Sequence, residues 1–173
     1  LDKLMFKKVI NLGYPSAMQM FFEVAIFTAA IEDLIEDNWQ VVPVVRDPLY
    51  VLMSWNSVPI ASSKGRVKVV ERFSNSLRDI GQQTPLIKRQ VLLLDWYFEQ
   101  YDRFANKEVI QYEKMIDDSE REINRFFPNN FVEFSRLNSK NNKKRYVCES
   151  EQAYRDALVK YGTTLKNFYP EYS

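Results

Sequence analysis

Apolar residues recur along the chain at two spacings, one typical of strands and one typical of helices. The run at 7–12 is short and apolar and predicts a buried strand, and apolar positions from Ser16 to Ile35 recur at helical spacing. Residues 40–45 are β-branched and almost entirely apolar, which is typical of a strand covered on both faces in a parallel sheet. Strand, helix and strand in this order predict a βαβ unit with its loops at the carboxyl edge of the sheet.

The rest of the chain has a mainly helical pattern. Asp47 and Pro48 form a helix start, so a helix is expected from there to about Ser57, followed by a small polar loop at 61–65. A third strand is predicted at 108–112. Four further helices are predicted. The first has Val70, Phe73, Leu77 and Ile80 on one face, and the second runs from the cap Thr84-Pro85 through Ile87 to Tyr101. The third follows the cap Asp117-Asp118, and the last runs from Ser150 to Gly162. Together these elements predict an α/β fold, a three-layer α/β/α domain with a central parallel sheet.

Composition and charge narrow the class of protein. The 173 residues, 46% of them hydrophobic, suffice for the core of one domain, 1–173. Because 24 basic residues are balanced by 23 acidic ones, a globally basic nucleic-acid binder is not expected. The apolar stretch 17–31 is shorter than the roughly 20 residues of a spanning helix, so no membrane partner is expected. A single cysteine, Cys148, and the absence of histidine exclude a structural zinc site and a Cys/His nucleophile, and they fit a cytoplasmic protein.

Arg46 is the residue with the clearest chemistry. It stands at the end of the predicted strand 40–45, and a helix is predicted to begin at Pro48. A guanidinium and the backbone N–H groups of a helix N-terminus both attract phosphate. Ser54 follows eight positions after Arg46, so its hydroxyl could reach the same anion. The alternative is structural, with Arg46 paired to Asp47 and Ser54 packed in the helix.

Two motifs resemble those of sulfotransferases that use PAPS (3′-phosphoadenosine 5′-phosphosulfate). The first is Arg-Asp-Pro at 46–48 with Ser54 eight residues after the arginine and an aromatic residue next, and the second is the segment 109–115. The resemblance implies that Arg46 and Ser54 hold the 3′-phosphate of PAPS or of the product, adenosine 3′,5′-bisphosphate. It places Tyr112 beside the nucleotide, where spacing alone equally allows a tyrosine packed on the sheet. It also implies a P-loop nucleotide kinase-like fold, and no metal is expected, because sulfuryl transfer has less charge to neutralise than transfer from ATP.

A third element of the family, the loop that holds the 5′-phosphosulfate, is incomplete in this sequence. Residues 9–15 are similar to the strand that enters the loop, and the segment from Ser16 is similar to the helix that leaves it, so Tyr14, Pro15 and Ser16 are assigned to the nucleotide site. The Lys-Ser-Gly-Thr-Thr-like middle is missing, so no catalytic lysine is assigned. Three explanations stay open: loop residues missing from this sequence, a degenerate protein, or a true loop upstream of Leu1.

A basic run late in the chain includes Lys143, Lys144 and Arg145. Sulfotransferases have a basic loop late in the chain that closes over the phosphates of the nucleotide, so the resemblance places these three residues at the site. The alternative is a solvated loop. A nucleic-acid surface is not expected, because few aromatic residues are interleaved with the charges.

The expected reaction is in-line transfer of a sulfuryl group to a hydroxyl or amine of a small-molecule or glycan acceptor. A base must take the acceptor's proton, and without histidine it should be a carboxylate, with Glu23, Glu32 and Glu36 as unranked candidates. Two alternatives stay open. One is a P-loop kinase relative that uses ATP, for which no Walker-type Gly-Lys-Ser/Thr is visible, and the other is a non-catalytic binding protein with a degenerate sulfotransferase fold.

Overall fold

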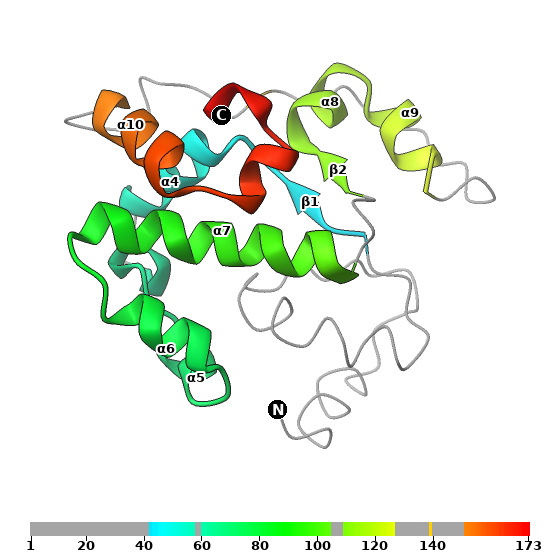
Figure 1. Cartoon of the computed structure of the whole chain (residues 1–173). Coiled ribbons are helices and arrows are strands. Elements are labelled where there is room, and N and C mark those ends of the chain that lie inside the picture. Colours follow the sequence, from blue (N-terminus) through cyan, green and yellow to red (C-terminus); the bar gives the residue numbers. More distant parts are fainter. Residues whose placement is uncertain (1–41, 58–59, 105–108, 127–138, 140–150) are drawn as a thin grey trace.

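The computed structural model describes residues 42–57, 60–104, 109–126, 139 and 151–173 (Figure 1). The predicted strand at 7–12 and the helix after Ser16 lie outside these residues. The strands are β1 (Val44–Val45) and β2 (Ile110–Gln111). The α-helices are α4 (Pro48–Asn56), α5 (Lys68–Glu71), α6 (Asn75–Gly81), α7 (Leu86–Phe104), α8 (Tyr112–Asp117), α9 (Ser119–Asn124) and α10 (Glu151–Tyr161), and the 3-10 helices are η1 (Ala61–Lys64), η3 (Thr164–Asn167) and η4 (Pro170–Tyr172).

The prediction of a three-layer α/β/α domain with a P-loop kinase-like sheet is wrong. In the described part of the chain, 71% of the residues are helical, and the sheet has two strands of two residues each, too few to form a layer covered on both sides. Each strand is cut short by a helix, because Asp47 caps α4 soon after β1 and α8 begins at Tyr112 directly after β2. The strand was also predicted to be buried on both faces, but Val44 in β1 is 44% exposed.

The two short strands lie within the predicted strands 40–45 and 108–112, and they pair in parallel. The register places Val44 opposite Ile110 and Val45 opposite Gln111. Because both strands run in the same direction, the residues that follow them meet at one carboxyl edge. This edge brings the two sequence motifs together.

Helix α7 is the centre of the described fold. The helices α4, α6 and α10 and the 3-10 helices η1 and η3 pack against it, and α5 and α6 lie on the opposite side of α7 from α10 and the C-terminal segment (Figure 1). Its aromatic residues Trp96, Tyr97, Phe98 and Tyr101 are buried, and the ring of Phe98 lies 5.2 Å from that of Phe168. These aromatic side chains are part of the hydrophobic core.

The segment 61–65, predicted to be a loop, is a 3-10 helix that is tied to α7. The buried side chain of Gln90 in α7 donates a hydrogen bond to the carbonyl oxygen of Ser63 (2.6 Å). The turn ends at Gly65, whose φ of 60° lies in the left-handed region, and a Cβ atom there would lie 2.9 Å from Cγ of Arg89. A glycine is therefore required for the chain to pass close to α7.

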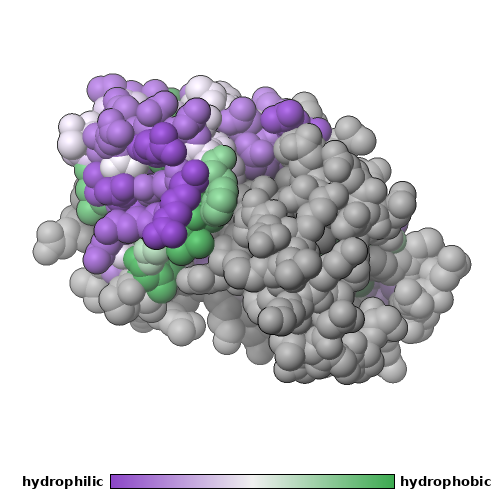
Figure 2. Space-filling view, turned by 90° about the horizontal axis from the view of Figure 1, so that it is seen from below, coloured by the Kyte–Doolittle hydropathy of each residue, from purple (hydrophilic) through white to green (hydrophobic). Residues whose placement is uncertain are grey.

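The single helix predicted over 70–80 is in fact two helices. Helix α5 ends at Glu71, and the hydroxyl of Ser74 caps α6 by accepting a hydrogen bond from the N–H of Leu77 (3.3 Å). Phe73 lies between the two helices and is 64% exposed rather than buried. Figure 2 views the molecule from this side and shows apolar side chains next to a polar surface. The cap at Ser74 explains why one predicted helix is two, because it starts a new helix although the apolar spacing continues across it.

An ion pair joins the buried Glu71 to the partly exposed Arg66. Nη2 of Arg66 lies 2.5 Å from Oε2 of Glu71, and Nε donates to Oε1 at 3.1 Å, so the contact has two points. The hydrogen bonds from Arg66 lower the pKa of Glu71 below its ordinary value, although burial acts in the opposite direction. The ionised carboxylate therefore stabilises the fold.

We expect Glu71→Gln to lower the free energy of unfolding by about 1–2 kcal/mol at neutral pH, because a buried charged acceptor is lost. A carboxylate whose folded pKa is lowered stabilises the fold above its unfolded pKa, and this stabilisation is lost as the pH falls through the folded pKa. In urea unfolding, the difference in the free energy of unfolding between wild type and Glu71→Gln should therefore become smaller in acid. The exposed Glu120 supplies the matched control, Glu120→Gln. A difference that does not change with pH would contradict this role for Glu71.

Candidate functional site

Arg46 and Tyr112 come together at the carboxyl edge of the two strands. Arg46 follows β1 directly, and Tyr112 follows β2. The Cζ atom of Arg46 lies 5.2 Å from the centroid of the Tyr112 ring and 5.7 Å from that of Tyr50 in the first turn of α4. A cation within about 6 Å of an aromatic ring is attracted to its face. The rings of Tyr50 and Tyr112 therefore contact the guanidinium of Arg46. The N–H groups of a guanidinium donate hydrogen bonds within its own plane.

Ser54 lies on the same side of α4 as Tyr50. Residues four apart are neighbours on a helix surface, and both of these are half-buried. Leu49, Leu52 and Met53 are the buried residues that pack α4 on the core. The structure thus places the hydroxyl of Ser54 one turn beyond the ring that contacts the guanidinium.

The N-terminus of α4 is capped by the protein itself. Oδ1 of Asp47 accepts a hydrogen bond from the N–H of Leu49 (2.9 Å), which confirms the predicted cap. The N–H of Asp47 donates to Oε1 of Glu113 (3.1 Å), and Pro48 has no N–H. The N–H groups of Asp47 and Leu49 are therefore hydrogen-bonded within the protein. Arg46 contributes a positive charge at this edge.

The last residues of the chain bind the two carboxylates of this edge. The hydroxyl of Tyr172 donates to Oδ1 of Asp47 (2.5 Å), and the hydroxyl of Tyr169 donates to Oε2 of Glu113 (3.0 Å). Both tyrosines are buried, and Figure 1 shows their segment close to α8. The first of these bonds joins residues 125 positions apart in the sequence, so the C-terminal segment is part of the site.

Both of these tyrosine hydroxyls are held in the protonated form. Burial raises the pKa of Tyr169 and of Tyr172 well above the ordinary value, and the neighbouring carboxylates of Glu113 and Asp47 raise each pKa further. Loss of either proton would place a second negative charge beside a carboxylate in a buried place. Each hydroxyl is therefore a hydrogen-bond donor at neutral pH.

Four residues of this edge have no role in the motif interpretation: Tyr50, Glu113, Tyr169 and Tyr172. Tyr50 carries a signal in the sequence, because it stands four residues after Arg46 at the start of a predicted helix. The signal for the other two tyrosines is weaker and consists of the many aromatic residues at 168–172. Their partners lie 56 and 125 positions away, and helix or strand periodicity does not predict contacts at such distances.

The remaining residues assigned to the nucleotide site lie outside the described part of the chain, so their roles stay predictions. They are Tyr14, Pro15 and Ser16 of the incomplete loop, Lys143, Lys144 and Arg145 of the basic run, and the candidate bases Glu23, Glu32 and Glu36. The described site consists of Arg46, Ser54 and Tyr112 with the residues that contact them.

A cavity of about 180 Å³ lies between β2, α8, α9 and the C-terminal segment, and Lys114, Glu122 and Arg125 are its charged lining residues. Glu122 and Arg125 form an ion pair across 3.4 Å, so charges of both signs line this cavity. Among the described residues, no group of three or more His, Cys, Asp and Glu side chains could hold a metal ion. In the same part of the chain, no helix combines the length and the apolar surface needed to cross a membrane.

Comparisons with known proteins give no independent indication of family. Protein-family models, curated proteins and solved structures were all compared with the chain, and none of them matches. Function is therefore inferred from the residues of the site.

Proposed function

We propose that the chain binds the 3′-phosphate of a nucleotide at the edge formed by Arg46, Ser54 and Tyr112. We further propose that it is the nucleotide-binding part of an enzyme that transfers a sulfuryl group from PAPS to a small-molecule or glycan acceptor. The observation that carries the proposal is the contact between Arg46 and Tyr112. These residues belong to the two sulfotransferase-like motifs, which are 66 positions apart and pair through adjacent parallel strands.

The chemistry of this edge suits a phosphate monoester. A guanidinium can donate two parallel hydrogen bonds to two phosphate oxygens, and a serine hydroxyl can donate a third. The rings of Tyr50 and Tyr112 restrict the guanidinium, so less conformational entropy is lost when the anion binds. A site for a 3′-phosphate would separate PAPS from ATP and AMP, which lack this group.

In the proposed reaction the bond between sulfur and the bridging oxygen of PAPS breaks, and a new bond forms between sulfur and the acceptor oxygen or nitrogen. The leaving group is adenosine 3′,5′-bisphosphate, and the acceptor's proton goes to a base. Arg46 binds and orients the nucleotide in this scheme and does not itself react. Its contribution is to fix the nucleotide for in-line transfer.

We expect adenosine 3′-monophosphate and adenosine 3′,5′-bisphosphate to bind at least ten-fold more tightly than AMP. A ten-fold difference corresponds to about 1.4 kcal/mol, which is within the range of one charge-assisted hydrogen bond. Isothermal titration calorimetry measures all three affinities. Adenosine 3′-monophosphate and AMP are a matched pair, because they differ only in the position of the phosphate. Equal affinities for this pair would contradict the proposed site for a 3′-phosphate and would favour a kinase-like nucleotide binder.

Release of adenosine 3′,5′-bisphosphate from PAPS tests the catalytic part of the proposal. The reaction is followed in the presence of pooled hydroxyl and amine acceptors. Release that depends on the acceptors supports a sulfotransferase. Tight binding without release would support the alternative, a non-catalytic binding protein.

A further inference from the structure

Two apolar side chains are exposed next to each other at the end of α5. Val69 is 59% exposed and Phe73 is 64% exposed, the two largest exposed fractions among the large apolar residues of the described chain. Phe73 lies in a turn that continues the helix, because its N–H donates to the carbonyl oxygen of Val70 (2.9 Å). Residues four apart are neighbours on a helix surface, so the two side chains form one small apolar surface.

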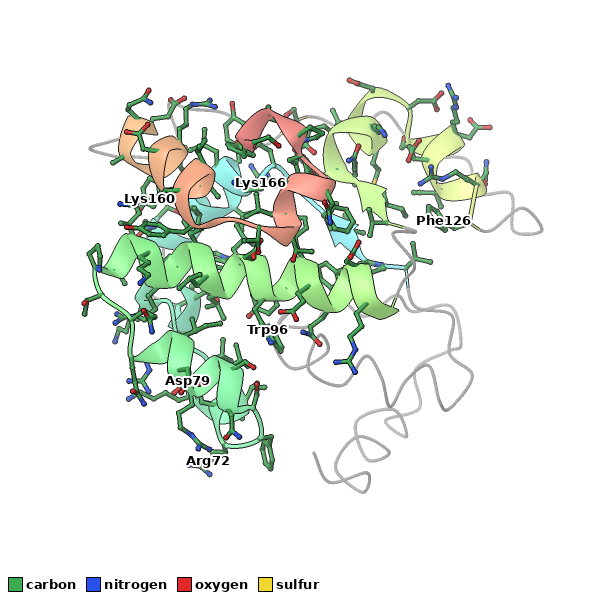
Figure 3. The ribbon with its side chains drawn as sticks, in the orientation of Figure 1. Arg72, Asp79, Trp96, Phe126, Lys160 and Lys166 are labelled. Atoms are coloured by element: carbon green, nitrogen blue, oxygen red, sulfur yellow. The ribbon has the colours of Figure 1, made fainter. Side chains whose placement is uncertain are left out.

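This apolar surface belongs to an outlying part of the described fold. Helix α5 packs against α6, and α6 packs against α7. Figure 1 shows α5 and α6 on the side of α7 that faces away from α10 and the C-terminal segment. Figure 3 shows Arg72 at the outer end of this pair of helices, farther from α7 than Asp79. The two apolar side chains therefore lie apart from the proposed nucleotide site.

Basic side chains border the apolar surface. Lys68 and Arg72 are both exposed, and each directly precedes one of the two apolar residues in the chain. Glu71, which lies between them, is buried, and its charge is balanced by the ion pair described above. The segment 64–79 has five basic residues and two acidic ones, of which Asp79 is exposed on α6. The exposed charge around the apolar surface is therefore mainly positive.

We propose that Lys68, Val69, Arg72 and Phe73, here called the α5 tip, bind the surface of a membrane that contains anionic lipids. The two apolar side chains enter the boundary between headgroups and acyl chains, and the two basic side chains bind the negatively charged headgroups. The expectation of no membrane partner concerned a spanning helix. A contact of the α5 tip lies on the surface of the bilayer and needs no spanning helix.

The size of the apolar surface favours lipid over a protein partner. The exposed parts of Val69 and Phe73 amount to on the order of 200 Å², whereas each partner in a stable protein interface buries roughly 800 Å² around a core depleted of charged residues. A membrane surface needs less apolar area, because each basic residue near anionic lipids strengthens binding by about five-fold. A small apolar surface bordered by exposed basic residues therefore indicates a lipid surface.

Cosedimentation of the full chain with vesicles, without nucleotide, tests this proposal and does not depend on the proposed function. We expect binding to vesicles of phosphatidylcholine with about 30% phosphatidylserine, and at least about five-fold weaker binding to pure phosphatidylcholine. Phe73→Ser should weaken binding at least about five-fold, because it removes most of the exposed apolar area. Arg72→Glu should weaken it at least about ten-fold, because it changes the charge of the tip by two. Both variants should melt as wild type does, because both side chains are exposed.

Val159→Ser and Lys160→Glu are the matched controls. They change an exposed apolar and an exposed basic side chain of α10, and Figure 3 shows Lys160 on the opposite side of α7 from Arg72. Both controls should bind the vesicles as wild type does. Equal losses in the controls and in the tip variants would overturn the proposal, because binding would then not depend on the α5 tip. A wild type that does not sediment with the anionic vesicles would also overturn it and would favour an acidic protein as the partner of the tip.

A second measurement separates insertion of the apolar side chains from attraction between charges alone. Lipids brominated in their acyl chains quench the fluorescence of an indole that enters the bilayer. The emission of Phe73→Trp should be quenched more strongly than that of Val159→Trp, and the three native tryptophans are common to both variants. Equal quenching of the two variants in vesicles that bind them would mean that Phe73 does not enter the bilayer, and the proposal would be overturned.

Discussion

Arg46→Ala should weaken the binding of adenosine 3′,5′-bisphosphate by roughly 100- to 1000-fold. A guanidinium can hold a phosphate through two parallel charge-assisted hydrogen bonds, and at about 1.5–2 kcal/mol each, the lower part of the range for charged groups, they account for a loss of this size. The structure places this group at the carboxyl edge of β1, between the rings of Tyr50 and Tyr112. Calorimetry on the folded variant measures the loss.

Arg46→Lys should have an affinity between those of wild type and Arg46→Ala. An ammonium keeps the positive charge but loses the planar fork that matches two phosphate oxygens. The control is Arg72→Ala, because Arg72 is an exposed arginine near α5, on the far side of α7 from the C-terminal segment 168–172 (Figure 3). This control should bind the nucleotide as wild type does.

The rival interpretation of Arg46 is a structural ion pair with Asp47. It predicts that Arg46→Ala lowers the melting temperature and leaves the affinity of the folded fraction nearly unchanged. Both quantities are measured on the same protein. Retained affinity together with a lower melting temperature would mean that the site assigned around Arg46 must be abandoned.

Local signals in the sequence predict the elements of this fold better than its architecture. The Asp47 cap, the α7 periodicity and the end of α10 before Gly162 depend on neighbouring residues, and all three are found in the structure. The three-layer sheet depends on how far each strand continues, and apolar composition does not limit that length. The described strands stop after two residues because a helix start follows each of them.

In the candidate site, too, contacts that follow from local signals could be predicted, and contacts between distant segments could not. The parallel pairing of the two motif strands predicts that Arg46 and Tyr112 meet, because residues after parallel strands share one edge. The hydroxyls of Tyr169 and Tyr172 reach this edge only because the chain folds back after α10. Such a return has no periodic signal, so contacts of this kind require the three-dimensional structure.

A carboxylate of α7, that of Asp95, binds the segment in which the chain turns back after α10. Its Oδ1 accepts hydrogen bonds from the N–H groups of Thr163 (3.0 Å) and Leu165 (2.8 Å), and its Oδ2 accepts from the hydroxyl of Thr163 (2.5 Å). Asp95 is nearly buried, and Leu165 is fully buried. The carboxylate therefore fixes η3, which leads directly into the C-terminal segment 168–172.

Asp95→Ala should lower the free energy of unfolding by about 2–4 kcal/mol. It leaves the N–H of the buried Leu165 without its acceptor, at about 1–3 kcal/mol, and it removes the side chain that anchors η3 to α7 and holds the more exposed Thr163. Asp95→Asn keeps one carbonyl oxygen and should lose about half as much. Asp79→Ala, at an exposed position of α6, is the control and should lose less than about 0.5 kcal/mol in the same urea unfolding series (Figure 3). Equal losses of stability in the Asp95 and Asp79 variants would show that this carboxylate does not hold the chain's return.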